Sequence, residues 1–438
     1  MAAKSSSAGK ISEVREEAAA VKRRGSPVQP VMAAPPPAPS APPASGAPAA
    51  AGNGKLSAEE REAQTALAAA ALAEAMATRD LPAFYRVFRA GDLAILPPRY
   101  YSRDPRGLHA ACFEILRRFG SISPAVGVAI FNHYAVSCTL STFPLRNNAT
   151  LASRRKALLA SLIAGRTLVA NTTSRVHSDK VESYGCVARH EGDGFHISGS
   201  AAYMSLATES ELVLVFSQLE GEGFAIFMAP LRDNPAIQIG PFLFPNAMVD
   251  SDTRSVTFDC HITPENMLRV DRTIAAFQVA WHQALFPAPF LGAAARALEE
   301  ARKFLRSVRA ANDRPLAEAD GVVADIGRLA IDYRAACAMV LQAGQAIEAV
   351  ARRPSLPEFM DAYHLANAAK HFATRVAEEI VTAVRRIIGG RSLAGTHPME
   401  RISQEVMFGP LGGEINALIE RRLGRLALGE NEFLSHRW

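Results

Sequence analysis

The sequence predicts an α+β fold in which a sheet domain separates two helical domains along the chain. Before about residue 165 and after residue 273, apolar residues recur at helical spacing, as in Leu329 and Tyr333. Between these segments they come in short runs separated by turns such as His190–Gly194. We therefore expect an N-terminal helical domain over 56–165, an antiparallel β-domain over 166–272 and a C-terminal four-helix bundle over 273–438.

Individual helices follow from the same periodicity. Ser57, followed by Glu59 and Glu60, is typical of a helix start, and an Ala- and Leu-rich run continues to Ala77. In the β-domain, turns are expected at His190–Gly194, at Gly221–Gly223 and at Asp233–Pro235. Further helices are expected near 81–92, 106–119, 123–142, 150–165, 273–312, 315–351, 357–387 and 416–427.

Residues 1–55 are predicted to be a disordered Pro- and Ala-rich tail. Nine prolines fall within residues 26–53, which have little apolar surface to bury. The tail carries seven basic and three acidic side chains, so it supplies most of the net charge of +5. The rest of the chain is then close to neutral, which argues against a nucleic-acid surface. A tether to a partner protein is the alternative role for this tail.

Cysteine usage and hydropathy indicate the cellular compartment of the protein. Its five cysteines are scattered without a CxxC pair, which predicts reduced thiols in a cytoplasmic protein and no metal site. No run of about 18 apolar residues occurs, so no membrane span is expected. The N-terminus lacks the apolar core of a secretory signal, and Glu13, Glu16 and Glu17 argue against an organellar presequence.

Five stretches in the same order resemble acyl-CoA dehydrogenases over roughly residues 60–435. The β-domain contains the turn Ser198-Gly-Ser200, then Tyr203 and Ser205, in a pattern similar to the family signature. The other stretches are Phe258–Leu268, which includes Pro264-Glu-Asn-Met-Leu268, then Arg296–Ala301, Arg309–Glu318, and Gly389-Gly390 followed by His397-Pro-Met-Glu-Arg401. The resemblance implies the predicted fold and a bound FAD.

The resemblance also implies roles for individual residues around the flavin. Ser205 would face the flavin N5 edge, and Tyr203 would pack on the ring. Asn171 and Thr172, which follow an expected strand over 167–170, would hold the pyrimidine edge. The remaining assignments are Arg309 on the pyrophosphate across a subunit boundary, Gly389 and Gly390 near the adenine, and His133, Ser178 and Gln283 at the substrate.

Structural alternatives stay open for several of these residues. Ser205 is otherwise a strand hydroxyl, Tyr203 a core aromatic, Arg309 a surface residue, and Gly389-Gly390 a helix stop. His133 is otherwise a buried polar contact inside its helix. The loop Asn171–Asp179 differs from the family pattern, and so do Asn312 and Asp313, which indicates an unusual substrate.

The family's reaction needs a carboxylate base, and Glu414 is the candidate. It precedes Asn416, the expected N-cap of a last helix over 417–428. A different alignment, anchored on Gly409-Pro-Leu411, leaves no acid at this position, and Glu414 is then a surface acid at a helix start. His282, beside Gln283, is another acid–base candidate.

The resemblance implies FAD-dependent α,β-dehydrogenation of an acyl thioester on CoA or an acyl-carrier protein. Glu414 would remove the α-proton while the β-hydride passes to flavin N5. The alternatives are a two-component flavin monooxygenase on the same fold and a non-catalytic binding subunit. The expected partners are an electron-transfer protein or oxygen, and further copies of the chain in a homotetramer.

Overall fold

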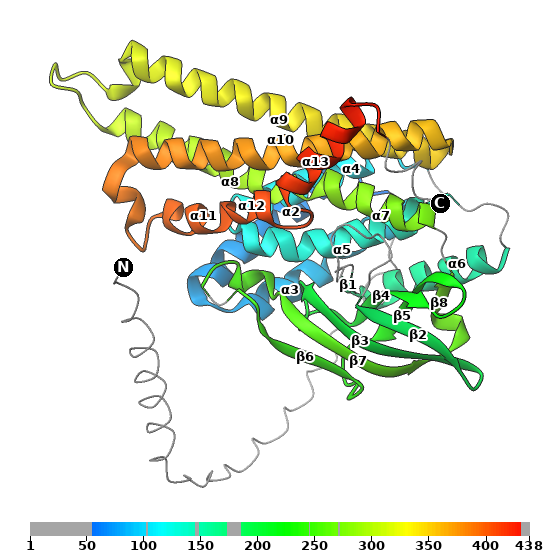
Figure 1. Cartoon of the computed structure of the whole chain (residues 1–438). Coiled ribbons are helices and arrows are strands. Elements are labelled where there is room, and N and C mark those ends of the chain that lie inside the picture. The colour runs from blue at the N-terminus through cyan, green and yellow to red at the C-terminus, as the bar shows by residue number, and fades with distance from the viewer. Residues whose placement is uncertain are drawn as a thin grey trace, which may run out of the picture. The chain divides into compact units, whose positions relative to one another are not determined.

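The computed structural model describes residues 55–101, 104–144, 149–172, 185–244, 246–269 and 272–430. Ser178 and all of the predicted tail except Lys55 lie outside these residues. Contacts group the chain from Asn53 onward into one unit. In Figure 1 this unit has the predicted order of helices, sheet and helices along the chain, so the α+β fold class is confirmed. The predicted domain boundaries within the unit stay predictions.

Helices make up the first part of the unit. Ser57 caps the first of them as expected: its hydroxyl accepts from Glu60 N at 3.1 Å, and the Glu60 carboxylate accepts from Ser57 N at 2.8 Å. One of them, α5, is buried along its whole length and contacts neighbours from all three parts of the fold. The helices are α2 (Ala58–Thr78), α3 (Leu81–Ala90), α4 (Leu108–Gly120), α5 (Pro124–Thr142) and α6 (Ala149–Gly165).

The described residues of the middle part form one eight-stranded sheet of order β6-β7-β3-β2-β4-β5-β8, with β1 beside β4. Most neighbours are antiparallel, but β1 and β2 both pair with β4 in parallel, which the sequence did not predict. Two of the expected turns close hairpins, where Gly192 (φ 60°) and Gly221 (φ 75°) take left-handed conformations. The strands are β1 (Val169–Thr172), β2 (Cys186–Glu191), β3 (Gly194–Met204), β4 (Leu212–Leu219), β5 (Gly223–Pro230), β6 (Ile237–Phe242), β7 (Arg254–Ile262) and β8 (Met267–Arg269).

The last part is a bundle in which α10 packs against α7, α8, α9, α11 and α13. The helix expected over 273–312 was wrong: it is two helices that meet at Phe286, because Pro287 and Pro289 have no N–H to continue the first one. The helices are α7 (Arg272–Leu285), α8 (Pro287–Ser307), α9 (Asp320–Arg352), α10 (Leu356–Ile388), α11 (Pro398–Val406), α12 (Phe408–Leu411) and α13 (Asn416–Ala427).

Two smaller expectations were also wrong. Asn171 and Thr172 do not follow a strand but form the second half of β1. Asn416 is not the N-cap of the last helix but its first residue, and Ile415 is the cap. The Asn416 side chain instead bonds α10, where its Nδ2 donates to His371 O at 3.3 Å.

Two hydrophobic cores show how the parts fit together. The first-part helices and the bundle share one core, which also takes in the helix-facing side chains Leu214 and Phe216 of β4. The alternate residues Val213 and Val215 belong to a second core within the sheet domain. The sheet is thus joined to the helices along one face, where a site between them can form.

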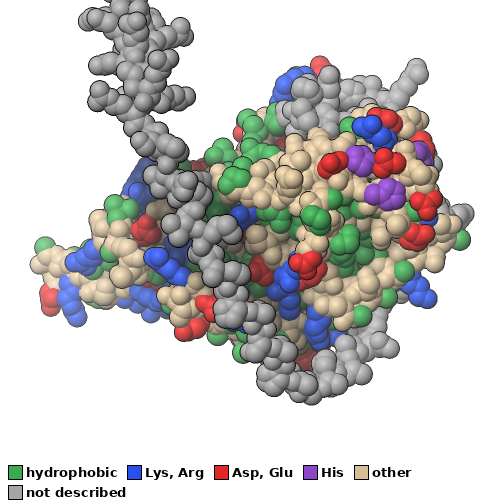
Figure 2. Space-filling model, turned by 90° about the horizontal axis from the view of Figure 1, so that it is seen from below, with side chains coloured by type: hydrophobic (Ala, Val, Ile, Leu, Met, Phe, Trp, Pro, Cys, Tyr) green, Lys and Arg blue, Asp and Glu red, His purple; other side chains and the backbone are tan. Residues whose placement is uncertain are grey.

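The outer face of the sheet is polar. Figure 2 shows histidine side chains beside acidic ones in a view from below. On this face the ring nitrogen of His196 lies 2.9 Å from an Asp259 oxygen. None of the helices in the described residues is both long and apolar enough to cross a membrane.

Candidate functional site

Two turns of the β-domain that face each other carry unusual backbone. The first spans the end of β3 and contains Tyr203 (φ 64°) and Leu206 (φ 60°), and the second precedes β7 and contains Met248 (φ 59°) and Asp252 (φ 48°). Leu206 N donates to Ser251 O at 3.0 Å, so the turns are bonded to each other. Left-handed backbone at non-glycine residues is costly and gathers at functional sites. These two turns are therefore the starting point for the candidate site.

Buried hydroxyls join the same two turns. Ser205 Oγ lies 2.8 Å from Thr253 Oγ1, which lies 2.7 Å from Ser251 Oγ. Ser251 Oγ in turn donates to Met248 O at 2.6 Å. Tyr203 is the opposite case, because 61% of its surface is exposed and its ring stacks on Phe244. An exposed aromatic face beside a buried hydroxyl suits a flat polar ring such as a flavin.

A series of aromatic contacts leads from Tyr203 into the bundle. Phe244 meets Phe408 of α12, and Phe408 meets Phe286, which stacks on His282 of α7. Phe131 of α5 closes the far side, with its ring centroid 4.6 Å from that of His282. We call this set the aromatic seam: Phe131, Tyr203, Phe244, His282, Phe286 and Phe408.

Two glycines let the backbone pack closely against the seam beside His282. A Cβ on Gly412 would lie 2.8 Å from Phe286 Cζ, and one on Gly413 would lie 3.0 Å from His282 Cε1. Gly413 also has a left-handed φ of 65°. Within the described part of the chain neither ring nitrogen of His282 has a hydrogen-bond partner, and the residue is only half-buried. Its imidazole is therefore free to bond a ligand.

Glu414 and Gln283 meet at the bundle end of the seam. Gln283 Nε2 donates to Glu414 Oε2 at 3.2 Å. Arg422 of α13 binds both carboxylate oxygens: its Nη1 donates to Oε2 at 2.6 Å, and its Nη2 donates to Oε1. The side chains of Glu414 and Arg422 are each only 15% exposed. The predicted base is thus held in a two-point ion pair.

Lys370 of α10 is fully buried beside this ion pair. Its Nζ donates to Glu414 O at 2.6 Å and to Asn416 Oδ1 at 2.9 Å, which fastens the segment after α12 to α10. Burial lowers the pKa of Lys370 to about 7, and the Glu414 charge opposes that change. Burial, together with the Lys370 charge, lowers the pKa of His282 to about 3, so this imidazole is neutral at physiological pH.

His133 is buried, and both of its ring nitrogens bond backbone groups. Val169 N donates to its Nδ1 at 3.1 Å, so the proton is on Nε2, which donates to Ala94 O at 2.7 Å. Burial lowers its pKa to about 4. Nearby, Asn171 Nδ2 donates to Asn132 Oδ1 at 3.3 Å. Thr172 is buried on β1, and its hydroxyl lies 3.5 Å from Leu214 O.

Three predicted flavin contacts lie away from the seam. Arg309 follows α8, a helix of about 30 Å that begins at the seam, and its exposed side chain bonds Asp313 O at 2.6 Å. Gly389 (φ 70°) ends α10, so the helix-stop alternative fits it, and a Cβ on Gly389 or Gly390 would meet nothing within 4 Å. Their roles toward a flavin stay predictions, as do those of the other site residues.

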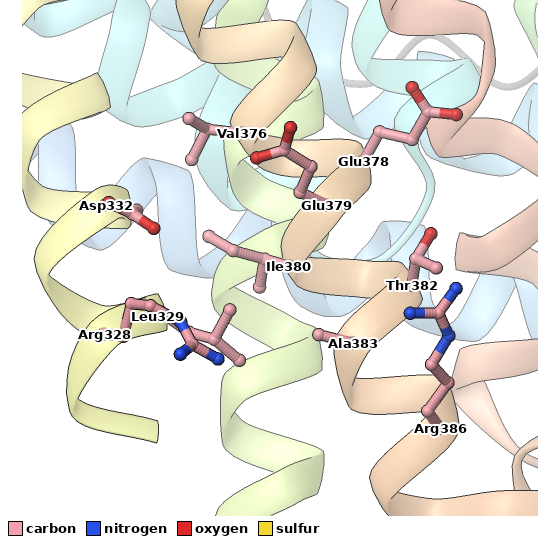
Figure 3. Close-up of a pocket in the computed structure, with 10 residues that line it drawn as sticks. All are labelled: Arg328, Leu329, Asp332, Val376, Glu378, Glu379, Ile380, Thr382, Ala383 and Arg386. Carbon is pink, nitrogen blue, oxygen red and sulfur yellow. The ribbon is translucent and has the colours of Figure 1, made fainter. Parts of the chain in front are cut away.

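A groove of about 440 Å³ lies elsewhere, between the yellow α9 and the orange α10 (Figure 3). Arg328 and Asp332 of α9 line it together with Glu379, Ile380 and Arg386 of α10. It contains none of the predicted site residues and no residue of the seam. We therefore do not assign the chemistry to this groove.

Sequence reasoning missed Lys370, Arg422 and the phenylalanines of the seam. A signal for Lys370 was present, because Asn367, Lys370 and Thr374 recur at helical spacing on a face of α10 that is otherwise apolar. A buried polar stripe of this kind predicts a partner across the bundle. The phenylalanines gave no such signal, since aromatic residues at helical spacing are typical of any core.

Comparisons with known proteins agree with this architecture. Residues 284–409 match the family model described as acyl-CoA dehydrogenase, C-terminal domain. No curated protein sequence matches the chain. Among solved structures, the fold resembles TdsC from Paenibacillus sp. A11-2 with FMN and indole at a TM-score of 0.72 and 19% identity, over 87% of this chain and 98% of that one.

Two other solved structures are similar. The electron transferring flavoprotein of Acidaminococcus fermentans gives a TM-score of 0.71 at 18% identity, over 85% of this chain and 99% of that one. XiaF from Streptomyces sp., in complex with FADH2 and glycerol, gives 0.69 at 15% identity, over 85% and 96%. The chain therefore has the fold of acyl-CoA dehydrogenases, and its residues 284–409 match the C-terminal domain described for that family.

Proposed function

We propose that the protein is a flavin-dependent oxidoreductase of the two-component monooxygenase type. A reduced flavin would lie against Tyr203 and Ser205, and the substrate would lie in the aromatic seam near His282. One observation carries this choice over dehydrogenation: both oxygens of Glu414, the carboxylate predicted as the base, are bound by Arg422.

A general base must offer a lone pair to the proton that it removes. Arg422 donates to both Glu414 oxygens, and Gln283 donates to one of them as well. To act as a base, Glu414 would leave Arg422 in a largely buried place without its anion, which is costly. The position thus favours a structural role for Glu414.

The residues of the seam suit oxygenation. When bound, a reduced flavin supplies two electrons to dioxygen, so that one oxygen atom enters the substrate and the other leaves as water. Tyr203 would cover the ring, and the Ser205 hydroxyl would bond its edge. The phenylalanines would hold an apolar substrate and exclude water, and the neutral His282 would hydrogen-bond its polar group.

Two of the solved structures that share the fold are in line with this proposal. TdsC is a dibenzothiophene monooxygenase and was solved with FMN, and XiaF was solved with FADH2. In the proposed reaction the partners are oxygen and a protein that supplies reduced flavin. The predicted homotetramer, with Arg309 of one subunit on the flavin of another, is part of the same proposal, and light scattering tests it.

Dehydrogenation of an acyl thioester with FAD is the second candidate. The match of residues 284–409 to the acyl-CoA dehydrogenase model favours it, as does the place of Glu414 at the end of the seam beside Gln283. In that reaction substrate binding would have to release Glu414 from Arg422 before the α-proton is removed.

Glu414→Gln separates the two candidates, because the amide keeps the shape but cannot take a proton. The wild type and the variant are each mixed anaerobically with FAD and a panel of acyl-CoA thioesters. In a separate experiment each is loaded with reduced FMN and then given oxygen and aromatic compounds. Thioester-driven bleaching of FAD that is lost by about 10²–10⁴-fold in the variant would establish dehydrogenation. We expect instead no bleaching by thioesters, and oxygen-dependent product that the variant retains at temperatures where it stays folded, with a lower melting temperature because Arg422 loses its anion. A protein that binds neither flavin would refute both candidates.

A further inference from the structure

The hydroxyls between the two β-domain turns have a defined direction. A carbonyl only accepts, so the Ser251 hydroxyl gives its single proton to Met248 O. Thr253 must then donate to Ser251, over 2.7 Å, and Ser205 must donate to Thr253, over 2.8 Å. Each hydroxyl in the series uses its proton on the next one. The direction is fixed by its last member, the main-chain oxygen.

Ser205 is consequently left with its oxygen lone pairs at the start of the series. Among the described residues no group donates to this oxygen. Ser205 is 6% exposed, whereas Thr253 is 3% exposed and Ser251 is fully buried. The hydroxyl at the start of the series, on the most exposed of these three buried residues, is therefore left as an acceptor.

We propose that Thr253 and Ser251 are positioning residues that fix Ser205 as a hydrogen-bond acceptor, so that the site selects reduced flavin over oxidised flavin. This inference rests on the proposed function, since it assigns the flavin to Tyr203 and Ser205. The N5 atom of a reduced flavin carries a hydrogen and donates, whereas N5 of an oxidised flavin only accepts. Because Ser205 gives its proton to Thr253, its oxygen can accept from N5 of a reduced flavin but has no proton to donate to N5 of an oxidised flavin.

Reversing the series is costly. For Ser205 to donate to oxidised N5, Thr253 must turn its proton toward Ser205, and Ser251 must turn its own toward Thr253. Met248 O then loses the bond from the Ser251 hydroxyl and keeps only the one from Ser251 N, at 3.0 Å. The loss of one buried hydrogen bond changes an equilibrium by roughly three- to tenfold. The backbone of the two turns cannot easily shift to restore that bond. Leu206 N donates to Ser251 O, and four residues of the turns are held in left-handed conformations: Tyr203, Leu206, Met248 and Asp252.

Thr253→Val tests the inference, because valine keeps the shape and removes the hydroxyl that directs Ser205. The full-length protein is titrated anaerobically with oxidised FMN and with dithionite-reduced FMN. The midpoint potential of bound FMN is measured separately. We expect the wild type to bind the reduced form more tightly, with the potential raised by about 30 mV for each tenfold preference. In Thr253→Val the preference should fall roughly three- to tenfold, mainly because oxidised FMN binds better.

Ser251→Ala is the second variant, since it also frees Thr253 to donate to Ser205, and it should lower the preference in the same direction. Ser217→Ala removes a buried hydroxyl of β4 that has no partner in the described residues, and it should leave the preference unchanged. Equal loss of both redox forms in Thr253→Val, or an unchanged ratio in both variants, would overturn the inference while flavin binding itself stands. Absence of binding to either form in the wild type would refute the proposed function and this inference together.

Discussion

The bundle makes two contacts with the rest of the chain, and they differ in how their polar groups are used. Against the N-terminal helices, bundle carboxylates are committed to helix starts. Glu348 accepts from Gly107 N at 3.0 Å and from His109 N at 2.7 Å, and Glu405 accepts from Ala125 N at 2.9 Å. Glu348 thus supplies the cap that Gly107 cannot give to α4, and Glu405 adds a second acceptor at the start of α5, where Ser123 is already the N-cap.

Against the sheet domain, the seam is arranged differently. His282 has no hydrogen-bond partner in the described residues, Gln283 Oε1 is buried without one, and Tyr203 is 61% exposed. The left-handed residues of the two turns add strain on the same side. The contact with the N-terminal helices is hydrogen-bonded at these carboxylates, whereas the seam keeps polar atoms without protein partners among the described residues. This difference is expected when a rigid scaffold supports a binding site. Substitutions on the two sides should therefore fail in different ways.

The largest expected effect is on the reaction, from His282→Phe. Phenylalanine keeps the ring between Phe131 and Phe286 but removes both nitrogens that would bond the substrate. We expect product formed per reduced flavin consumed to fall by about 10²-fold or more, with little change in melting temperature because no protein hydrogen bond is lost. Product analysis after anaerobic loading with reduced FMN and addition of oxygen measures it.

His133→Phe is the matched control for this substitution. His133 is the buried histidine whose two ring nitrogens bond Val169 N and Ala94 O. Its loss should lower the free energy of unfolding by about 1–3 kcal/mol per unsatisfied group. If His282→Phe destabilises the protein as much as His133→Phe and spares the reaction, the two contacts of the bundle do not differ as argued.

The sequence predicted elements better than the contacts between them. Helices such as α10 and the cap at Ser57 follow from local periodicity and local hydrogen bonding, which neighbouring residues determine. The break at Phe286 was missed although Pro287 and Pro289 were visible, because the apolar pattern continues across it. The ion pair of Glu414 with Arg422 and the bond from Lys370 could not be predicted. They depend on how α10, α13 and the intervening segment pack in three dimensions.

The next effect is on the pH dependence of stability, and it comes from Glu405 at the contact between the bundle and the N-terminal helices. Burial raises the pKa of Glu405 to about 7 in the folded protein, against the bonds from Ala125 N and Ser123 and the charge of Arg401, with Asp250 acting in the same direction as burial. Between its unfolded value of 4.5 and about 7 the folded state binds more protons than the unfolded state. The stability that Glu405 contributes is therefore fully present below pH 4.5 and is lost as the pH rises through 7.

Glu405→Gln should remove this dependence. The free energy of unfolding of the wild type, relative to the variant, should fall by about 3 kcal/mol between pH 4.5 and pH 7.5, as measured by denaturant titration. Glu60→Gln is a control of opposite sign, because bonds from Ser57 lower the pKa of Glu60. That contribution is present at neutral pH and is lost in acid. A difference for Glu405→Gln that is flat or rises with pH would show that the carboxylate is not buried at the start of α5.

The smallest effect comes from one substitution made at two places on α9. Gly344 is buried, and a Cβ there would clash with the His109 ring, which is held by its bond to Ala284 O at 3.0 Å and stacked on Phe113. Gly344→Ala should therefore lower the free energy of unfolding by about 1–3 kcal/mol.

Gly327 is exposed in the same helix, and a Cβ there would meet nothing within 4 Å. Gly327→Ala should raise the free energy of unfolding by about 0.5–1 kcal/mol, because alanine has the lower conformational entropy when unfolded and the higher helix propensity. Thermal and denaturant unfolding of the two variants measure both. Two changes of the same sign would mean that helix propensity alone decides the outcome, and that α9 does not pack closely on His109.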